Sequence, residues 1–238
     1  PGLVEVRKSS SEEPSASAEA EGQQPAAPST WSSIVSLCKS RLFLFTVAAG
    51  SFQSGVVGFM LYFITQALSA NFGWSPQKLY AIVAAMIAVG PISGILLGAK
   101  YLNSVGGYSD YANAHRLTAG CAVLSLLSSL CLPLAGTSAW LYGIASFGLL
   151  ILGAAPTAAI NGIAVSAVPN VSHAASGVQF AAQNLAKLIV PALGGAVIDR
   201  IGLIRGYNLV TIGVVALYAI AANLAYREAL RHPKQEAE

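Results

Sequence analysis

The chain has 238 residues, of which 55% are hydrophobic and 10% are charged, and its formal net charge is +3. Soluble domains are typically about 45–50% apolar and about 25% charged, so this chain has too few polar residues to cover a soluble fold of its size. Most charges lie before Leu42, after Tyr226 or in short gaps between long apolar runs, as expected where lipid makes a charge costly. The basic residues are scattered singly and form no stripe, so we expect no nucleic-acid partner.

Both ends of the chain are polar. Residues 1–30 are rich in Ser, Glu, Ala, Gln and Pro, which predicts a disordered polar linker because such a segment buries little apolar surface. Residues 227–238 are predicted to form a polar C-terminal tail. The chain begins with Pro1 and its first apolar run begins only at Leu42, so we interpret it as a fragment or a processed chain.

Residues 31–41 join the linker to the first apolar run. Within them, Trp31, Ile34, Val35 and Cys38 recur at helical spacing. Two interpretations are open at this point. The segment is either a short amphipathic helix that lies at the membrane interface or a plain linker.

The central part of the chain, residues 42–226, consists of six apolar segments separated by short gaps. Each segment is close to the roughly 20 residues that a helix needs to cross a bilayer. The predicted spans are Leu42–Ala70, Leu79–Leu102, Leu117–Leu134, Trp140–Val168, Ala174–Ile198 and Asn208–Tyr226. They are longer and more continuously apolar than barrel strands, which alternate apolar and polar residues. The sequence therefore predicts an all-α integral membrane domain of six transmembrane helices.

Basic residues at the helix ends indicate how this domain is oriented. With six spans, both termini lie on one side, and the positive-inside rule assigns the more basic side to the cytosol. The side with the termini carries Lys39, Arg41, Lys100, Arg116, Arg227, Arg231 and Lys234, and the other side carries Lys78, Arg200 and Arg205. We therefore expect a multi-pass protein with both termini in the cytosol.

Proline and glycine recur inside the predicted spans. Proline kinks a helix, and small residues let two helices approach closely. In the first span, the pairs Ser51/Gly55 and Ser54/Gly58 predict a close helix contact, which is either a static seam or a sliding surface. The other candidates for a conformational role are Pro91, Gly94, Gly98, Pro156, Pro191, Gly194 and Gly195. Such residues suit a protein that opens and closes, although static membrane proteins contain them too.

Lys187 is the only charged residue well inside a predicted span, and Gln183 and Asn184 lie one turn before it. An ionisable residue at membrane depth is by default a candidate for a functional site. Lys187 would bind an anionic headgroup, a phosphate or a carboxylate, or pair with a carboxylate on a missing half. The alternative is a lysine that extends toward the interface or bonds to nearby carbonyls.

Other polar residues in the spans are candidates for a substrate site. Gln53 and Tyr62 lie in the first span together with Gln66, and Asn161 lies in the fourth. They either line a cavity or bond to neighbouring helices.

The residues required for most catalytic or metal sites are missing from the predicted spans. The spans contain no Asp or Glu, and the three histidines (His115, His173 and His232) lie outside them or at their ends. The three cysteines lack metal-ligand spacing, and we interpret them as small apolar residues. We expect no metal, no cofactor and no enzymatic activity, although a serine with Lys187 as its base is formally possible.

Two stretches resemble the major facilitator superfamily of transporters. The fifth span reads Ser176-Gly-Val-Gln-Phe-Ala-Ala-Gln-Asn184 and then Pro191-Ala-Leu-Gly-Gly-Ala-Val-Ile-Asp-Arg-Ile-Gly202, which is similar to helix eleven of that family. The second span and its loop, Gly94 to Gly107, resemble helix eight and the loop after it. Where the family often has Asp-Arg-x-Gly, that loop has Asn103-Ser104-Val105-Gly106, so a gating role for the loop is in doubt.

The resemblance implies that the chain is the C-terminal six-helix half of a transporter. Within the superfamily, the pattern of Pro156, the Val168-Pro169 turn, Gln179 and the Gly106-Gly107 loop is most similar to the Spinster-like lipid transporters. The resemblance also implies alternating access around a central site, a gating role for Asp199 and Arg200, and a small organic solute or amphiphile as substrate. The implied partners are the lipid bilayer and a missing N-terminal half or a second copy. The first, second, fourth and fifth spans would border the cavity. The alternative hypothesis is a six-helix structural or assembly subunit without transport activity.

Overall fold

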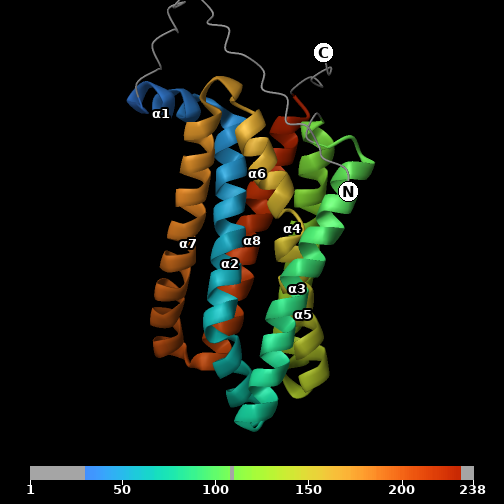
Figure 1. The fold of residues 1–238 in the computed structure, drawn as a ribbon. Coiled ribbons are helices and arrows are strands. Elements are labelled where there is room, and N and C mark those ends of the chain that lie inside the picture. The colour runs from blue at the N-terminus through green and yellow to red at the C-terminus, as the bar shows by residue number, and fades with distance from the viewer. Residues whose placement is uncertain (1–29, 108–109, 232–238) are drawn as a thin grey trace, which may run out of the picture.

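The computed structural model describes residues 30–107 and 110–231, and within these ranges the chain is all-helical with no strand. The helices are α1 (Thr30–Lys39), α2 (Arg41–Phe72), α3 (Pro76–Ser104), α4 (Tyr111–Leu134), α5 (Ala139–Ala154), α6 (Thr157–Ser166), α7 (Ser172–Ile201) and α8 (Leu203–Ala229), with short 3-10 turns at Ala135–Thr137 and Pro169–Val171. Six helical stretches of the described chain are long and apolar enough to cross a membrane, one of them formed by α5 and α6 together. The prediction of a six-span α-helical membrane protein is confirmed at this level (Figure 1).

The structure corrects several predicted boundaries. Helix α4 begins at Tyr111 and not at Leu117, because the Asp110 side chain accepts a hydrogen bond from the backbone N–H of Asn113 and caps the helix earlier. His115 therefore lies inside a span and not outside it. Helix α8 begins directly after Gly202 and runs past the predicted start of the polar tail. The predicted disordered linker, apart from its last residue, lies outside the described residues.

The fourth predicted span is two helices and not one. Helix α5 ends at Ala154 and α6 begins at Thr157, with Ala155 and Pro156 forming a turn between them. Proline cannot donate the backbone hydrogen bond that would continue the helix, which favours an interruption at Pro156. By contrast, α3 and α7 remain continuous through Pro91 and Pro191.

Helix α1 is a helix and not an unstructured linker, and it lies across one end of the bundle (Figure 1). Leu37 is 1% exposed and packs in a cluster with Phe43, Ala164 and Ala175. Two residues of the predicted apolar face, Val35 and Cys38, remain exposed. These exposed side chains are free to contact a membrane surface. The interfacial role of α1 stays a prediction.

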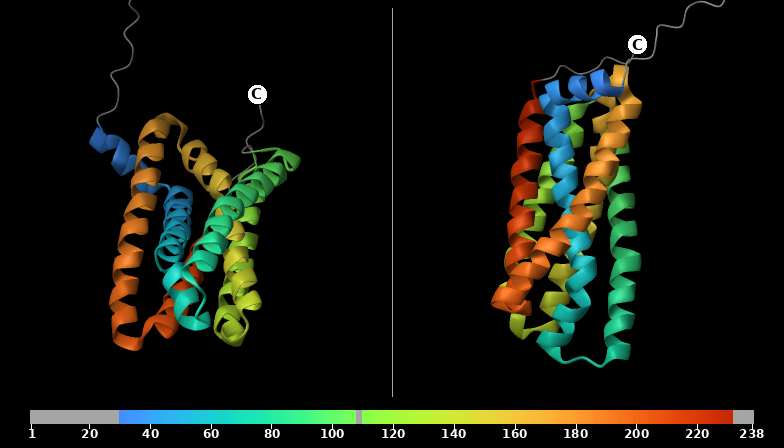
Figure 2. Two further views of the ribbon diagram at one scale, coloured as in Figure 1. Left: turned by 60° about the horizontal axis from the view of Figure 1, so that its bottom comes forward. Right: turned by 90° about the vertical axis from the view of Figure 1, so that its left-hand side faces the viewer.

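The helices differ strongly in the share of their residues that the rest of the protein buries. In the most apolar stretches of α2 and of the α5–α6 pair, 56% of the residues are buried, whereas the share is 28% in α3 and 11% in α7. Figure 2 shows α3 and α7 on either side of α2. The main apolar core lies between α2, α3, α5 and α8, around Phe59, Tyr142, Leu149 and Tyr207. Helices α3 and α7 therefore form two weakly covered margins of the bundle.

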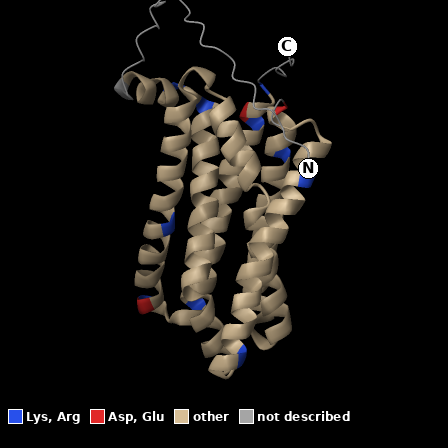
Figure 3. Ribbon diagram, viewed as in Figure 1, with Lys and Arg blue, Asp and Glu red and all other residues tan. Residues whose placement is uncertain are grey.

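Charged residues gather toward the two ends of the bundle, apart from one basic residue halfway along α7 (Figure 3). Helix directions place Lys39, Arg41, Lys100, Arg116 and Arg227 at the end where α1 lies and α8 finishes. This distribution agrees with the pattern on which the predicted orientation rests. That the basic end faces the cytosol remains a prediction.

The orientation gives a direct test at the sequon Asn170-Val171-Ser172, which lies between α6 and α7 at the basic end. We expect no glycan at Asn170, because a cytosolic loop does not meet the glycosylation machinery. The measurement is gel mobility before and after treatment with a deglycosylase, with Asn170→Gln as the control. A mobility shift that the control lacks would reverse the predicted topology.

Candidate functional site

The site begins with Lys187, which lies halfway along α7. At about 1.5 Å per residue, Lys187 is roughly 20 Å from either end of the helix, near the middle of a bilayer. Its side chain is exposed in this chain. Within residues 30–107 and 110–231, the single salt bridge joins Arg231 to Glu228, so Lys187 has no carboxylate partner there. An unpaired ammonium group is therefore presented at membrane depth.

Lys187 lines a groove of about 570 Å³ between α2 and α7. The groove is lined by Gly58, Tyr62, Phe63, Lys187, Leu188, Pro191, Ala192, Gly195, Ala196 and Asp199. Tyr62 is 67% exposed, which leaves its phenol available to a ligand. Asp199 lies about 18 Å from Lys187 along the helix. The groove thus has apolar walls, one basic group at its end near the middle of α7 and one acidic group at its other end, opposite the chain termini.

Glycines of α2 bring the two helices of the groove together. A Cβ atom at Gly58 would lie 3.1 Å from the Cα atom of Lys187, and one at Gly55 would lie 2.6 Å from Cγ2 of Val190. The predicted close helix contact of the first span is therefore made with α7. Whether these surfaces slide stays a prediction.

A second set of polar residues lies one helical turn before Lys187, toward the start of α7. The Nε2 atom of Gln183 donates a hydrogen bond to Oδ1 of Asn161 at 3.0 Å, which joins α7 to α6. Gln179 is buried beside them, and neither of its side-chain polar atoms has a hydrogen-bond partner among the described residues. Asn184 is exposed, and within the described residues its side chain makes no hydrogen bond to Gln183, Asn161 or Lys187. The predicted substrate residues therefore form two groups, with Lys187 and Tyr62 in the groove and Gln183 and Asn161 above it.

No known protein family and no curated protein sequence matches this chain. In the described part of the chain, no three His, Cys, Asp or Glu side chains are placed to hold a metal ion. The groups that the groove offers are an ammonium, a phenol, a carboxylate and apolar side chains.

Gln53 was predicted to line a cavity or to bond to neighbouring helices, and it bonds to the α5–α6 pair. It is 5% exposed, and its Nε2 atom donates to the carbonyl oxygen of Gly153 and to Oγ1 of Thr157, the latter at 3.0 Å. The helix break leaves carbonyls in the last turn of α5 without intrahelical partners. Gln53 supplies one of those partners, so it holds the break in place and does not line the groove.

Replacing Gln53 with Leu is expected to lower the free energy of unfolding by about 1–3 kcal/mol, because the buried Gly153 carbonyl would lose its partner. Thermal unfolding in detergent, followed by circular dichroism, measures this loss. Gln66→Leu is the matched control, since Gln66 is exposed on the same helix. Equal stability of the two variants would contradict the role assigned to Gln53.

The predicted conformational residues fall into two places. Gly94 and Gly98 of α3 face the break in the fourth span, where added Cβ atoms would overlap the carbonyl oxygens of Ile151 and Ala155. Pro191, Gly195 and Asp199 line the groove, and Gly194 packs against the Phe59 ring. Pro91 lies within α3, and Arg200 is exposed near the end of α7. Gly94, Gly98 and Pro156 therefore all lie at the break between α5 and α6. This place is separate from the groove that contains Lys187.

The buried polar pair of His115 and Thr46 was not predicted from the sequence. His115 is fully buried, and its Nε2 atom lies 3.1 Å from Oγ1 of Thr46, which itself donates to the Leu42 carbonyl oxygen. Because the Thr46 hydroxyl hydrogen is already used, His115 donates from Nε2, and its Nδ1 is an acceptor that has no partner in the described ranges. The pair ties α2 to α4 near the basic end.

Proposed function

We propose that this chain is one half of a membrane transporter that moves a small organic solute or amphiphile by alternating access. The observation that carries the proposal is Lys187, an ammonium group halfway along a membrane-spanning helix that lines an open groove and has no carboxylate partner in the part of the chain that the structure describes. A charge at membrane depth is costly unless it faces water, a ligand or a partner charge. Such groups commonly mark substrate pathways.

The lining of the groove indicates the kind of substrate. An ammonium group and a phenol beside apolar walls complement a molecule with an acidic group and a hydrocarbon part. Leu188, Pro191 and Ala192 supply apolar surface next to Lys187. The proposed substrate is therefore an organic acid or an anionic amphiphile.

The weakly covered margins of the bundle support a second half. Helices α3 and α7 carry many exposed apolar residues, among them Ile92, Leu96, Leu188 and Leu193. A second six-helix unit, either an N-terminal half or a second copy, would cover part of these faces and complete the site. The resemblance to the major facilitator superfamily has the same implication.

The coding sequence upstream of Pro1 tests this architecture. Six further apolar spans would support a twelve-helix transporter, whereas an initiation codon directly before Pro1 would overturn the half-transporter and leave a six-helix unit that works as a dimer or as an assembly subunit. Uptake assays separate those two: uptake that is lost when Lys187 is truncated in the folded protein favours the dimeric transporter, whereas no uptake by the folded protein favours the assembly subunit.

A further inference from the structure

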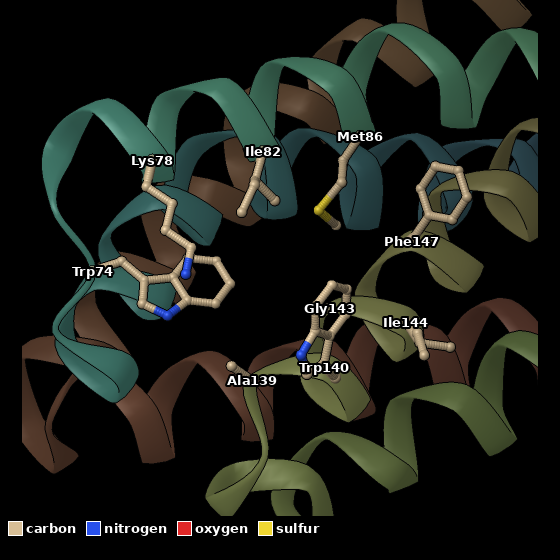
Figure 4. A pocket seen from close by; sticks show the side chains of 9 residues that line it. All are labelled: Trp74, Lys78, Ile82, Met86, Ala139, Trp140, Gly143, Ile144 and Phe147. Carbon is tan, nitrogen blue, oxygen red and sulfur yellow. The ribbon is translucent and has the colours of Figure 1, made fainter.

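A second cavity lies at the end of the bundle opposite the chain termini, between α3 and α5 (Figure 4). Its volume is about 350 Å³, within the range of roughly 300–1,000 Å³ that is usual for small-molecule sites. It is lined by Trp74, Lys78, Ile82, Met86, Ala139, Trp140, Gly143, Ile144 and Phe147. It shares no lining residue with the Lys187 groove, so it is a separate site.

The cavity extends from the helix ends toward the middle of the bundle. Trp74 precedes α3, and Trp140 is the second residue of α5. Met86 lies eight residues after Lys78, about 12 Å farther along α3. If the helices span the bilayer, the mouth of the cavity lies among the lipid headgroups and its inner part lies beside the acyl chains. Tryptophan is typical of that interfacial level.

The mouth and the interior have different chemistry. The Lys78 Nζ atom lies 4.9 Å from the centroid of the Trp74 ring, and Figure 4 shows it at the Trp74 side of the cavity. No carboxylate of the described residues lies within ion-pair distance of Lys78. The interior is formed by Ile82, Met86 and Phe147, which offer no charge. The cavity thus combines an available cation at its mouth with an apolar wall behind it.

We propose that this cavity binds one anionic phospholipid. The phosphate pairs with Lys78, the indole groups of Trp74 and Trp140 lie at the level of the glycerol esters, and one acyl chain lies against Ile82 and Met86. A soluble anion would gain nothing from the apolar interior, and a neutral hydrocarbon would gain nothing from Lys78. The site is independent of the proposed transport function.

Tryptophan fluorescence reports directly on this cavity, because two of the three tryptophans of the chain line it. A Trp31→Phe background leaves only these two. The chain is placed in nanodiscs that contain phospholipid with brominated acyl chains, which quench tryptophan at short range. Quenching is compared at equal mole fractions of brominated phosphatidylglycerol and brominated phosphatidylcholine.

We expect the anionic lipid to bind about fivefold more tightly, the preference that one lysine near the membrane surface supplies. Lys78→Gln should abolish this preference and leave quenching by the zwitterionic lipid unchanged. Gly143→Leu should reduce quenching by both lipids, because a Cβ at Gly143 meets no atom within 4 Å and the side chain would fill the cavity. Gly213→Leu on α8 is the matched control, since a Cβ there also meets nothing within 4 Å.

Two results would overturn the proposal. Equal quenching by both lipids, unaffected by Gly143→Leu, would show general contact with surrounding lipid and no site. Little quenching by either lipid, in a chain with intact helical circular dichroism, would show that protein covers the cavity. Lys78→Gln keeps the test valid if Gly143→Leu fails to fold, because it alters only an exposed side chain at the mouth.

Discussion

Replacing Lys187 with Gln is expected to weaken binding and uptake of an acidic substrate by about tenfold to a hundredfold, because a hydrogen bond to a charged group contributes about 1.5–3 kcal/mol. Lys187 is the only Lys or Arg on the groove that the structure describes. The expected effect is therefore on affinity for the acid, while the fold is maintained. Binding is measured by titration of candidate organic acids and anionic amphiphiles, and uptake is measured in proteoliposomes.

Two further variants serve as controls for Lys187→Gln. Lys187→Arg should retain much of the binding, because it preserves the positive charge. Lys100→Gln should have no effect, because Lys100 lies near the end of α3 and does not line the groove. Full binding and uptake in Lys187→Gln would mean that the lysine only extends toward the interface, and the substrate site would then have to be sought elsewhere.

Replacing Gly98 with Ala is expected to lower the free energy of unfolding by about 3 kcal/mol or more, at the upper end of the range for overpacking. The added Cβ would overlap the Ala155 carbonyl oxygen and lie 2.7 Å from the Ala155 carbonyl carbon. Both atoms belong to the backbone at the break between α5 and α6, so a rotamer change cannot relieve the clash. Either α3 moves away from the break or the break changes its shape.

Gly120→Ala is the matched control for this prediction, since a Cβ at Gly120 meets no atom within 4 Å. Alanine is favoured over glycine inside a helix by about 1 kcal/mol, so the control should be neutral or more stable. Thermal unfolding of both variants in the same detergent gives the comparison. If Gly98→Ala is as stable as the control, α3 does not pack on the break as described.

The spans were predictable from the sequence because long apolar runs follow directly from the thickness of a bilayer. The break at Pro156 was not predicted, because proline removes a backbone hydrogen bond but does not always end a helix, and α3 and α7 continue through Pro91 and Pro191. The unusual position of Lys187 was visible because it is an isolated charge in an apolar run. That position made it a candidate without any knowledge of its neighbours.

The partners of the polar side chains were not predictable in the same way. Gln53 meets Gly153 across 100 residues of sequence, and Thr46 meets His115 across 69. Such pairs depend on which helices become neighbours, and no local pattern encodes that. His115 was also hidden because a polar stretch precedes the apolar run of α4, and the helix begins within that stretch through the Asp110 cap.

The central claim, alternating access of the groove, is tested most directly by labelling a single cysteine from each side of the membrane. Cys38, Cys121 and Cys131 are replaced with Ser, Leu188→Cys places a thiol beside Lys187, and Leu217→Cys on α8 serves as a control outside the groove. A charged, membrane-impermeant thiol reagent is then applied to each side of the membrane in turn. The account predicts that residue 188 reacts from both sides, that an acidic substrate slows the reaction, and that residue 217 reacts from neither. Reaction of residue 188 from one side only, or from neither side in a folded protein, would contradict it.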